Sequence, residues 1–216
     1  ITGAVSSATS IWKEIYSQGN SVENPLFDKV LPYYSKEILK REFDAGRGPV
    51  LPECFETSIL TEVRKLSAEQ LRSFPFVAEG LENRIKQAAS VSGSLEELLG
   101  AISTRRYPLT RIQRTLFNFL IGLKSDEFVQ FNKYGGPQYA RVLGFNTRGR
   151  FLLSKMKQTC SLPVIVKASY YKNSCNVLLK RMLERDILAT DIYVLGYASP
   201  EHRKAGQDFT NSVIMV

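Results

Sequence analysis

Arginine and lysine side chains are the groups in this sequence whose spacing suggests chemistry, and that chemistry is the binding of phosphate. Arg105 and Arg106 precede Pro108, and Arg111 and Arg114 follow it three residues apart. Because proline suits the first turn of a helix, the four guanidinium groups should converge on the face opposite its apolar stripe. A guanidinium group offers phosphate a planar pair of donors. The spacing therefore favours an RNA-contact element, with a solvated helix face as the alternative.

A second basic cluster falls on a helix predicted from about residue 146 to 158. Arg148 and Lys155 are seven residues apart, as are Arg150 and Lys157, which gives two nearly parallel rows. These rows should lie on the exposed side of the helix, with its apolar residues facing the core. Free backbone amides at the start of the helix would add a further phosphate contact.

The charge distribution supports a polyanionic partner. Residues 128–183 contain no Asp or Glu and ten bases: Lys133, Arg141, Arg148, Arg150, Lys155, Lys157, Lys167, Lys172, Lys180 and Arg181. Residues 1–70 carry a formal charge of −2 and residues 71–216 a charge of +10. Such asymmetry favours nucleic acid or an anionic membrane surface as a partner, the alternative being a basic protein with no specific partner. No apolar stretch approaches the roughly 20 residues that span a bilayer, so we expect no membrane partner.

Several catalytic and metal-binding classes are excluded. His202 is the one histidine, so a Ser-His-Asp triad or a two-histidine metal site cannot form. Cys54, Cys160 and Cys175 are odd in number and form no CxxC pair, which argues against a disulfide framework or a zinc site. The sequence has no P-loop, GxGxxG or nucleophile elbow. We predict no catalytic residue, no metal and a reducing, cytoplasmic compartment, and the oligomeric state stays open.

The elements that must position these bases follow from periodicity and capping residues. The sequence SAEQ at residues 67–70 has the form of a capping box, and residues 45–52 have the composition of a linker. Apolar spacing predicts helices at 7–18, 35–44, 52–66, 67–72, three between 76 and 124, 146–158, 174–185 and 190–196, with strands at 139–145 and 162–167. A strand, a helix and a second strand in this order predict a parallel βαβ unit.

The predicted fold class is mainly α with a small parallel βαβ element, α+β overall. The expected architecture is a helical bundle plus a basic α/β subdomain. We place the helical subdomain at residues 49–127 and the basic α/β subdomain at residues 128–216.

Several motifs in series resemble one family. FPFVAEGLENRIKQAA (74–89), STRRYPLTRIQRTL (103–116), RVLGFNTRGRFLL (141–153) and GQDFT (206–210) are similar to the C-terminal half of the bacterial tRNA(Met) cytidine acetate ligases. The resemblance implies an ATP-dependent activation of acetate to acetyl-adenylate by an N-terminal HIGH-type nucleotidyltransferase domain. The acetyl group then passes to N4 of the wobble cytidine of elongator tRNA(Met). It also implies that the region resembled here helps to hold the tRNA.

The start of the chain resembles the last motif of that nucleotidyltransferase domain. VSSATSIW (5–12) is similar to an SSATxIR pattern, which makes Ser6, Ser7 and Thr9 the candidate ATP contacts and an ordinary helix N-cap the alternative. Trp12 stands where the pattern has Arg, and no HxGH motif is present. The resemblance therefore implies that residues 1–48 are the tail of the nucleotidyltransferase domain and a linker, and that ATP is bound mainly by a missing N-terminal domain. On this interpretation the chain alone is an inactive fragment of a ligase. A non-catalytic RNA-binding module and a divergent nucleotidyltransferase-family protein without acetate activation are the alternatives.

Overall fold

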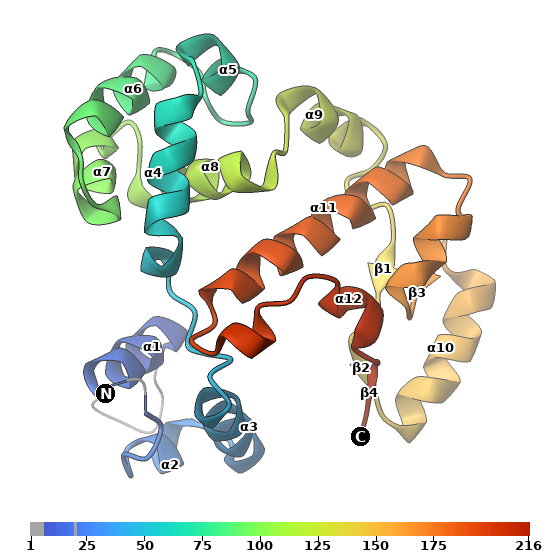
Figure 1. Ribbon diagram of the computed structural model, residues 1–216. Coiled ribbons are helices and arrows are strands. Elements are labelled where there is room, and N and C mark those ends of the chain that lie inside the picture. The colour runs from blue at the N-terminus through green and yellow to red at the C-terminus, as the bar shows by residue number, and fades with distance from the viewer. Residues whose placement is uncertain (1–6, 20) are drawn as a thin grey trace. The chain divides into compact units, whose positions relative to one another are not determined.

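The computed structural model describes residues 7–19 and 21–216, with only the backbone for residues 171–173. The described chain divides into two compact units. One contains residues 7–54, apart from residue 20, together with 193–204; the other contains residues 55–192 and 205–216. Figure 1 shows the order of the elements along the chain.

The first unit is built on three helices, α1 (Ala8–Ser17), α2 (Phe27–Val30) and α3 (Tyr33–Asp44). Its core is made by Ile15, Val22 and Phe27, all buried. The predicted linker at residues 45–52 does not run free: the backbone amide of Ser199 donates to the carbonyl of Gly46 at 3.1 Å. Gly46 has φ of 68°, and a Cβ there would lie 2.9 Å from the Ser199 side chain, so this return of the chain requires glycine.

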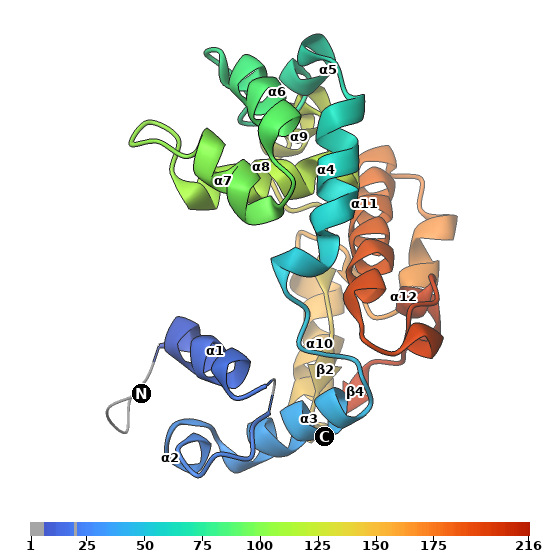
Figure 2. The ribbon, with the colours of Figure 1, turned by 60° about the vertical axis from the view of Figure 1, so that its left-hand side comes forward.

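Six helices form most of the second unit: α4 (Glu56–Lys65), α5 (Ala68–Arg72), α6 (Leu81–Val91), α7 (Leu95–Ile102), α8 (Leu109–Ile121) and α9 (Ser125–Lys133). Helix α4 packs against α8 and α6, as Figures 1 and 2 show from two sides. The predicted capping box is confirmed, because Ser67 accepts from the amide of Gln70 and the Gln70 side chain accepts from the amide of Ser67. On α8 the predicted apolar stripe is buried at Ile112 and Leu116.

Basic side chains close several helix ends in this unit. Lys86 donates to three carbonyl oxygens at the end of α4, and Arg64 donates to two near the end of α6. Arg84 donates to the carbonyls of Ala101 and Ile102 at the end of α7. The last carbonyls of a helix lack partners and carry partial negative charge, so a cation is favourable there. These bases are therefore engaged in the fold without pairing with any carboxylate.

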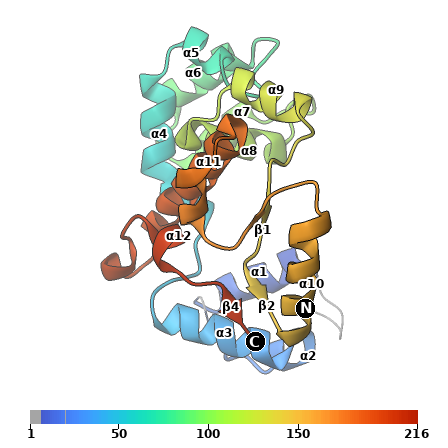
Figure 3. The ribbon, with the colours of Figure 1, turned by 90° about the vertical axis from the view of Figure 1, so that its right-hand side faces the viewer.

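Two short parallel strand pairs belong to the same unit. Strand β1 (Ala140–Arg141) pairs with β3 (Val164–Ile165), as the βαβ pattern predicts, and helix α10 (Thr147–Thr159) lies between them in sequence. Strand β2 (Gly144–Phe145) pairs instead with β4 (Ile214–Met215), beside which α10 is seen in Figure 3. The predicted strand at 139–145 thus serves two partners, and β4 is missed by the sequence pattern.

The predicted pair of helices at 174–185 and 190–196 is wrong. One helix, α11 (Val177–Tyr193), continues through the predicted break, followed by the 3-10 turns Val194–Gly196 and Pro200–His202 and by α12 (Gln207–Thr210). No glycine or proline occurs between Val177 and Tyr193 to end the helix.

The predicted architecture, a helical bundle plus a basic α/β subdomain, is also wrong. The helices α4 to α9 and both strand pairs fall in one compact unit. Helix α11 is the physical reason, because it contacts residues of both predicted subdomains. Its Leu179, Leu183 and Ile187 pack in a core with Tyr139 and Ile165. Between Leu183 and Ile187 on the same helix, Arg185 donates to α8 and α9, as described below. The domain boundaries at residues 48 and 127 stay predictions.

Candidate nucleic-acid interface

The approach to α8 is fixed by a turn around a buried tyrosine. Thr104 and Tyr107 exchange backbone hydrogen bonds of 3.1 Å. Pro108 is then the N-cap of α8, directly before the first turn in which the sequence predicted it. The guanidinium carbons of Arg106 and Arg111 lie 5.7 and 5.4 Å from the Tyr107 ring centre, within range of a cation–π contact.

The four arginines of this region fall into two kinds. Arg106 forms an ion pair with Glu79, which raises the pKa of Arg106, and Arg111 donates to the carbonyl oxygen of Phe76 at 2.9 Å. Arg105 and Arg114 are exposed and have no protein partner in the described part of the chain. The local sequence contains no Glu near these arginines, so the ion pair with Glu79, a residue 27 positions away, was missed. Two of the four predicted phosphate contacts are thus free, and two are engaged in the fold.

Helix α10 carries the second cluster entirely on its surface. Arg148, Arg150 and Lys157 are exposed, and Lys155 lies 5.0 Å from the ring centre of Phe151. Within the described residues none of the four contacts a carboxylate, and neighbouring charges of one sign attract a polyanion. The helix therefore presents four cations for binding.

One expectation about α10 is corrected, and a second is narrowed. Its apolar residues were expected to face the core, but no residue of α10 is buried, and Phe151 and Leu152 are 63% and 57% exposed. The helix start was expected to offer amides to phosphate. The side-chain oxygen of Asn146 accepts from one of them, the amide of Gly149, at 2.8 Å, and for the other amides of the first turn the expectation stays a prediction.

The candidate ATP residues lie at the start of α1, except that Ser6 falls outside the described residues. The hydroxyl oxygen of Ser7 accepts from the amide of Ser10 at 3.1 Å, the geometry of an N-cap. Thr9 is exposed in the first turn of the helix, and Trp12, three residues later, is 45% exposed. The Ser7 hydroxyl is committed to the cap, which leaves the Thr9 hydroxyl as the freer of the two.

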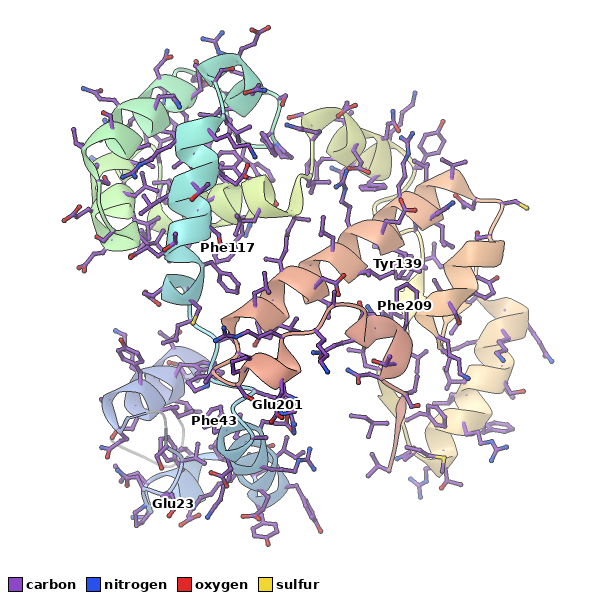
Figure 4. The ribbon with its side chains drawn as sticks, viewed as in Figure 1. Glu23, Phe43, Phe117, Tyr139, Glu201 and Phe209 are labelled. Carbon is purple, nitrogen blue, oxygen red and sulfur yellow. The ribbon has the colours of Figure 1, made fainter. Side chains whose placement is uncertain are left out.

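A network that sequence reasoning missed joins two of the family-like motifs. Arg141 of RVLGF forms a 2.5 Å ion pair with Asp208 of GQDFT, which raises the pKa of Arg141. Beside it, the hydroxyl of Tyr139 donates to the carboxylate of Asp186 on α11, at the place labelled Tyr139 in Figure 4. Burial first, and then this carboxylate, raise the pKa of Tyr139 far above its ordinary value. Arg141 therefore differs from its neighbours in the acid-free run, because its acid comes from 67 residues away.

A further ion pair organises the end of α8. Arg185 donates to Glu127 at 2.9 Å and to the carbonyl of Ile121 at 3.1 Å, so α11 holds the ends of both α8 and α9. An open cleft beside this pair is lined by three bases, three acids and a leucine: Lys124, Arg181, Arg185, Asp126, Glu127, Glu184 and Leu188. Its balanced charge does not favour an anion.

The described residues offer neither a cluster of metal ligands nor a membrane-spanning helix. Among them, no three His, Cys, Asp or Glu side chains gather closely enough to hold a metal ion. Within residues 7–19 and 21–216, no helix combines the length and the apolar character needed to cross a membrane.

Sequence relatives carry one name. A tRNA(Met) cytidine acetate ligase of Acetivibrio thermocellus is 46% identical over 216 residues, a match that covers 100% of this chain and 52% of that protein. The enzyme of the same name from Halothermothrix orenii is 41% identical, covering 97% of this chain and 50% of its own length. The chain thus spans about half the length of the curated relatives it matches.

Solved structures agree with this similarity. The crystal structure of Thermotoga maritima TmcAL bound with alpha-thio ATP has a TM-score of 0.88 and 29% identity, covering 98% of this chain and 52% of that one. Its apo form gives a TM-score of 0.89 over 98% of this chain and 51% of that one. The fold is therefore that of the matched TmcAL region as a whole, which overturns the predicted bundle plus separate subdomain.

The family match also corrects the predicted division of labour. A family model described as HIGH Nucleotidyl Transferase matches residues 1–208. The expectation that the chain resembles only the C-terminal half of the family, behind its nucleotidyltransferase part, is therefore wrong. So are the two inferences that depended on it, namely that ATP belongs mainly to a missing N-terminal domain and that the chain is an inactive fragment. The error arose because a few short catalytic motifs were used to delimit the family. With a family match over most of its length and relatives up to 46% identical among those compared, the chain belongs to the HIGH nucleotidyl transferase family.

Proposed function

We propose that this chain takes part in the ATP-dependent acetylation of N4 of the wobble cytidine of elongator tRNA(Met). Acetate is the second substrate, and acetyl-adenylate is the activated intermediate. The proposal brings to this chain the activity named for its relatives, tRNA(Met) cytidine acetate ligase.

The observation that carries the proposal is the unpaired charge of α10. Four cations stand on a helix of 13 residues without any acid, and none contacts a carboxylate in the described part of the chain. A purely structural surface normally mixes both signs. Binding of tRNA phosphates explains why Arg148, Arg150, Lys155 and Lys157 remain free, and Arg105 and Arg114 extend the same set.

ATP enters the proposal through the start of α1. Ser6, Ser7 and Thr9 are the proposed contacts, because amides at a helix start carry partial positive charge toward phosphate. Because the Ser7 hydroxyl is engaged in the N-cap bond, removal of the Thr9 hydroxyl should weaken ATP binding most directly.

Partner specificity tests the proposal. The chain should bind elongator tRNA(Met) more tightly than a tRNA with another anticodon loop, and far more tightly than duplex DNA of equal charge, measured by filter binding at fixed salt. Equal affinity for the two tRNAs would favour the RNA-binding module instead. Equal affinity for tRNA and DNA would remove the tRNA proposal altogether.

A further inference from the structure

The loop between α5 and α6 has a backbone that its sequence does not favour. In the segment SFPFVAEG at residues 73–80, Phe76 has φ of 69° and Glu79 has φ of 59°. A bulky residue has a Cβ and lacks the conformational freedom of glycine, so it rarely adopts this left-handed region. Such a conformation is kept only where the surrounding structure enforces it. The loop is therefore strained, and something must hold it.

Contacts from the α8 side hold the two left-handed residues. Arg111 donates to the carbonyl of Phe76 at 2.9 Å, and the Tyr107 hydroxyl donates to the carbonyl of Glu79 at 3.0 Å. The Glu79 carboxylate is paired with Arg106. Both strained carbonyls are thus fixed by buried or partly buried donors from one neighbouring element.

The beginning of the loop is fixed as firmly. The amide of Ser125 donates to the carbonyl of Ser73 at 2.8 Å, and the Lys124 ammonium donates to the Ser73 hydroxyl at 3.0 Å. The same ammonium lies 3.4 Å from the ring centre of Phe74, and burial lowers the pKa of Lys124. The loop is consequently rigid at both ends.

The loop fixed in this way places the Phe76 ring partly in solvent. Its neighbours Phe74 and Pro75 are buried, whereas Phe76 is 37% exposed and meets Phe128 edge-on at 5.3 Å between ring centres. Core packing alone does not account for a large ring at a left-handed position when part of that ring faces water.

The surroundings of the ring define its ligand. Arg111, which donates to the Phe76 carbonyl, is the cation that the structure places at the loop itself. Arg105 belongs to the turn and Arg114 to the helix that hold the loop, and neither has a protein partner in the described residues. An exposed aromatic ring beside cations binds unpaired nucleotides, because the ring stacks on a base while the cations hold the flanking phosphates. A-form stems offer no such base, since their bases are stacked and paired.

We propose that Phe76 is the stacking platform for one unpaired base of the bound tRNA. The inference rests on the proposed function and adds to it a residue that stacks on an unpaired nucleotide. The strained backbone keeps the ring in its outward position in the free protein, so tRNA binding has to order this side chain only a little further.

The test uses Phe76→Gly in the full chain. Glycine accepts the left-handed conformation, so the melting temperature should stay the same or rise while the affinity for tRNA falls by about 10- to 100-fold. Phe76→Tyr should restore binding, and Phe76→Leu, which keeps the apolar contact with Phe128 but not the aromatic face, should not.

A spectroscopic readout identifies the base. Among tRNA(Met) transcripts that carry a single 2-aminopurine at each unpaired position in turn, one should be quenched by the wild type and not by Phe76→Gly. If the wild type binds tRNA and both Phe76→Gly and Phe76→Leu bind equally well, the stacking role is wrong and the proposed function stands. If the wild type itself does not bind tRNA, both fail.

Discussion

At the scale of single residues, the residue type alone does not determine whether an arginine stabilises the fold or stays available for a ligand. Arg106 and Arg111 hold the loop at residues 73–80, while Arg105 and Arg114 in the same cluster face solvent. The difference comes from acceptors that the fold brings close, which no local spacing reveals. Substitutions should therefore separate the two kinds.

Reversal of the two free arginines should affect binding alone. Arg105→Glu with Arg114→Glu removes two phosphate contacts and adds repulsion, so tRNA affinity should fall by several kcal/mol. The free energy of unfolding should change by no more than about 0.5 kcal/mol, as is usual for exposed charges. Arg111→Met is the contrasting variant, because it removes the hydrogen bond to the Phe76 carbonyl and should lower the free energy of unfolding by about 0.5–1.5 kcal/mol. Unfolding by the double reversal would mean that these residues are structural.

The raised pKa of Tyr139 should make the free energy of unfolding depend on pH. Burial and the Asp186 carboxylate raise its pKa in the folded chain above the ordinary value of 10.0, so the folded state holds the proton where the unfolded state has lost it. The stability contributed by Tyr139 should thus be complete below pH 10 and be lost as the pH rises further, by at most about 1.4 kcal/mol per pH unit. Denaturation of the wild type and Tyr139→Phe between pH 8 and 11 measures this. A difference between the two that is constant with pH would contradict it.

At the scale of elements, α8 and α10 show how far periodicity can be trusted. Both have apolar residues at helical spacing, but Leu116 of α8 is 1% exposed and Leu152 of α10 is 57% exposed. The pattern predicts a helix in both cases, and only the fold tells which apolar face is covered.

Truncation of these two leucines should affect the stability of the fold to different extents. Leu116→Ala leaves a cavity and should cost about 2–5 kcal/mol of unfolding free energy, without changing tRNA affinity in the fraction that remains folded. Leu152→Ala should cost less than about 0.5 kcal/mol. Chemical denaturation gives both values, and a large loss from Leu152→Ala would show that α10 is packed after all.

Sequence reasoning succeeded where the cause is local. The capping box at Ser67, the start of α8 at Pro108 and the parallel pairing of β1 with β3 all follow from neighbouring residues or from one βαβ unit. It failed where partners are far apart in the chain. The ion pair between Arg141 and Asp208 and the pairing of β2 with β4 each join residues about 70 positions apart, which no periodicity encodes.

At the scale of the whole molecule, a net charge of +8 overstates the surface available to a polyanion. Arg64, Arg84 and Lys86 bind helix-terminal carbonyls, so they keep their charge but have donors already engaged. Free cations concentrate instead in residues 128–183, where α10 lies. The account therefore places tRNA affinity in a region and not in the total charge.

The salt dependence of tRNA binding tests this most directly. Glutamine substitution of the four α10 bases should reduce the slope of log affinity against log salt by roughly three, because each lost phosphate contact removes about 0.7–0.9. The control makes the same change in net charge with bases outside residues 128–183, namely Lys29, Lys40, Arg41 and Lys65. The account predicts a near wild-type slope for that control and a much flatter one for the α10 variant. Equal slopes for the two variants would contradict the assignment of α10 as the tRNA-binding surface.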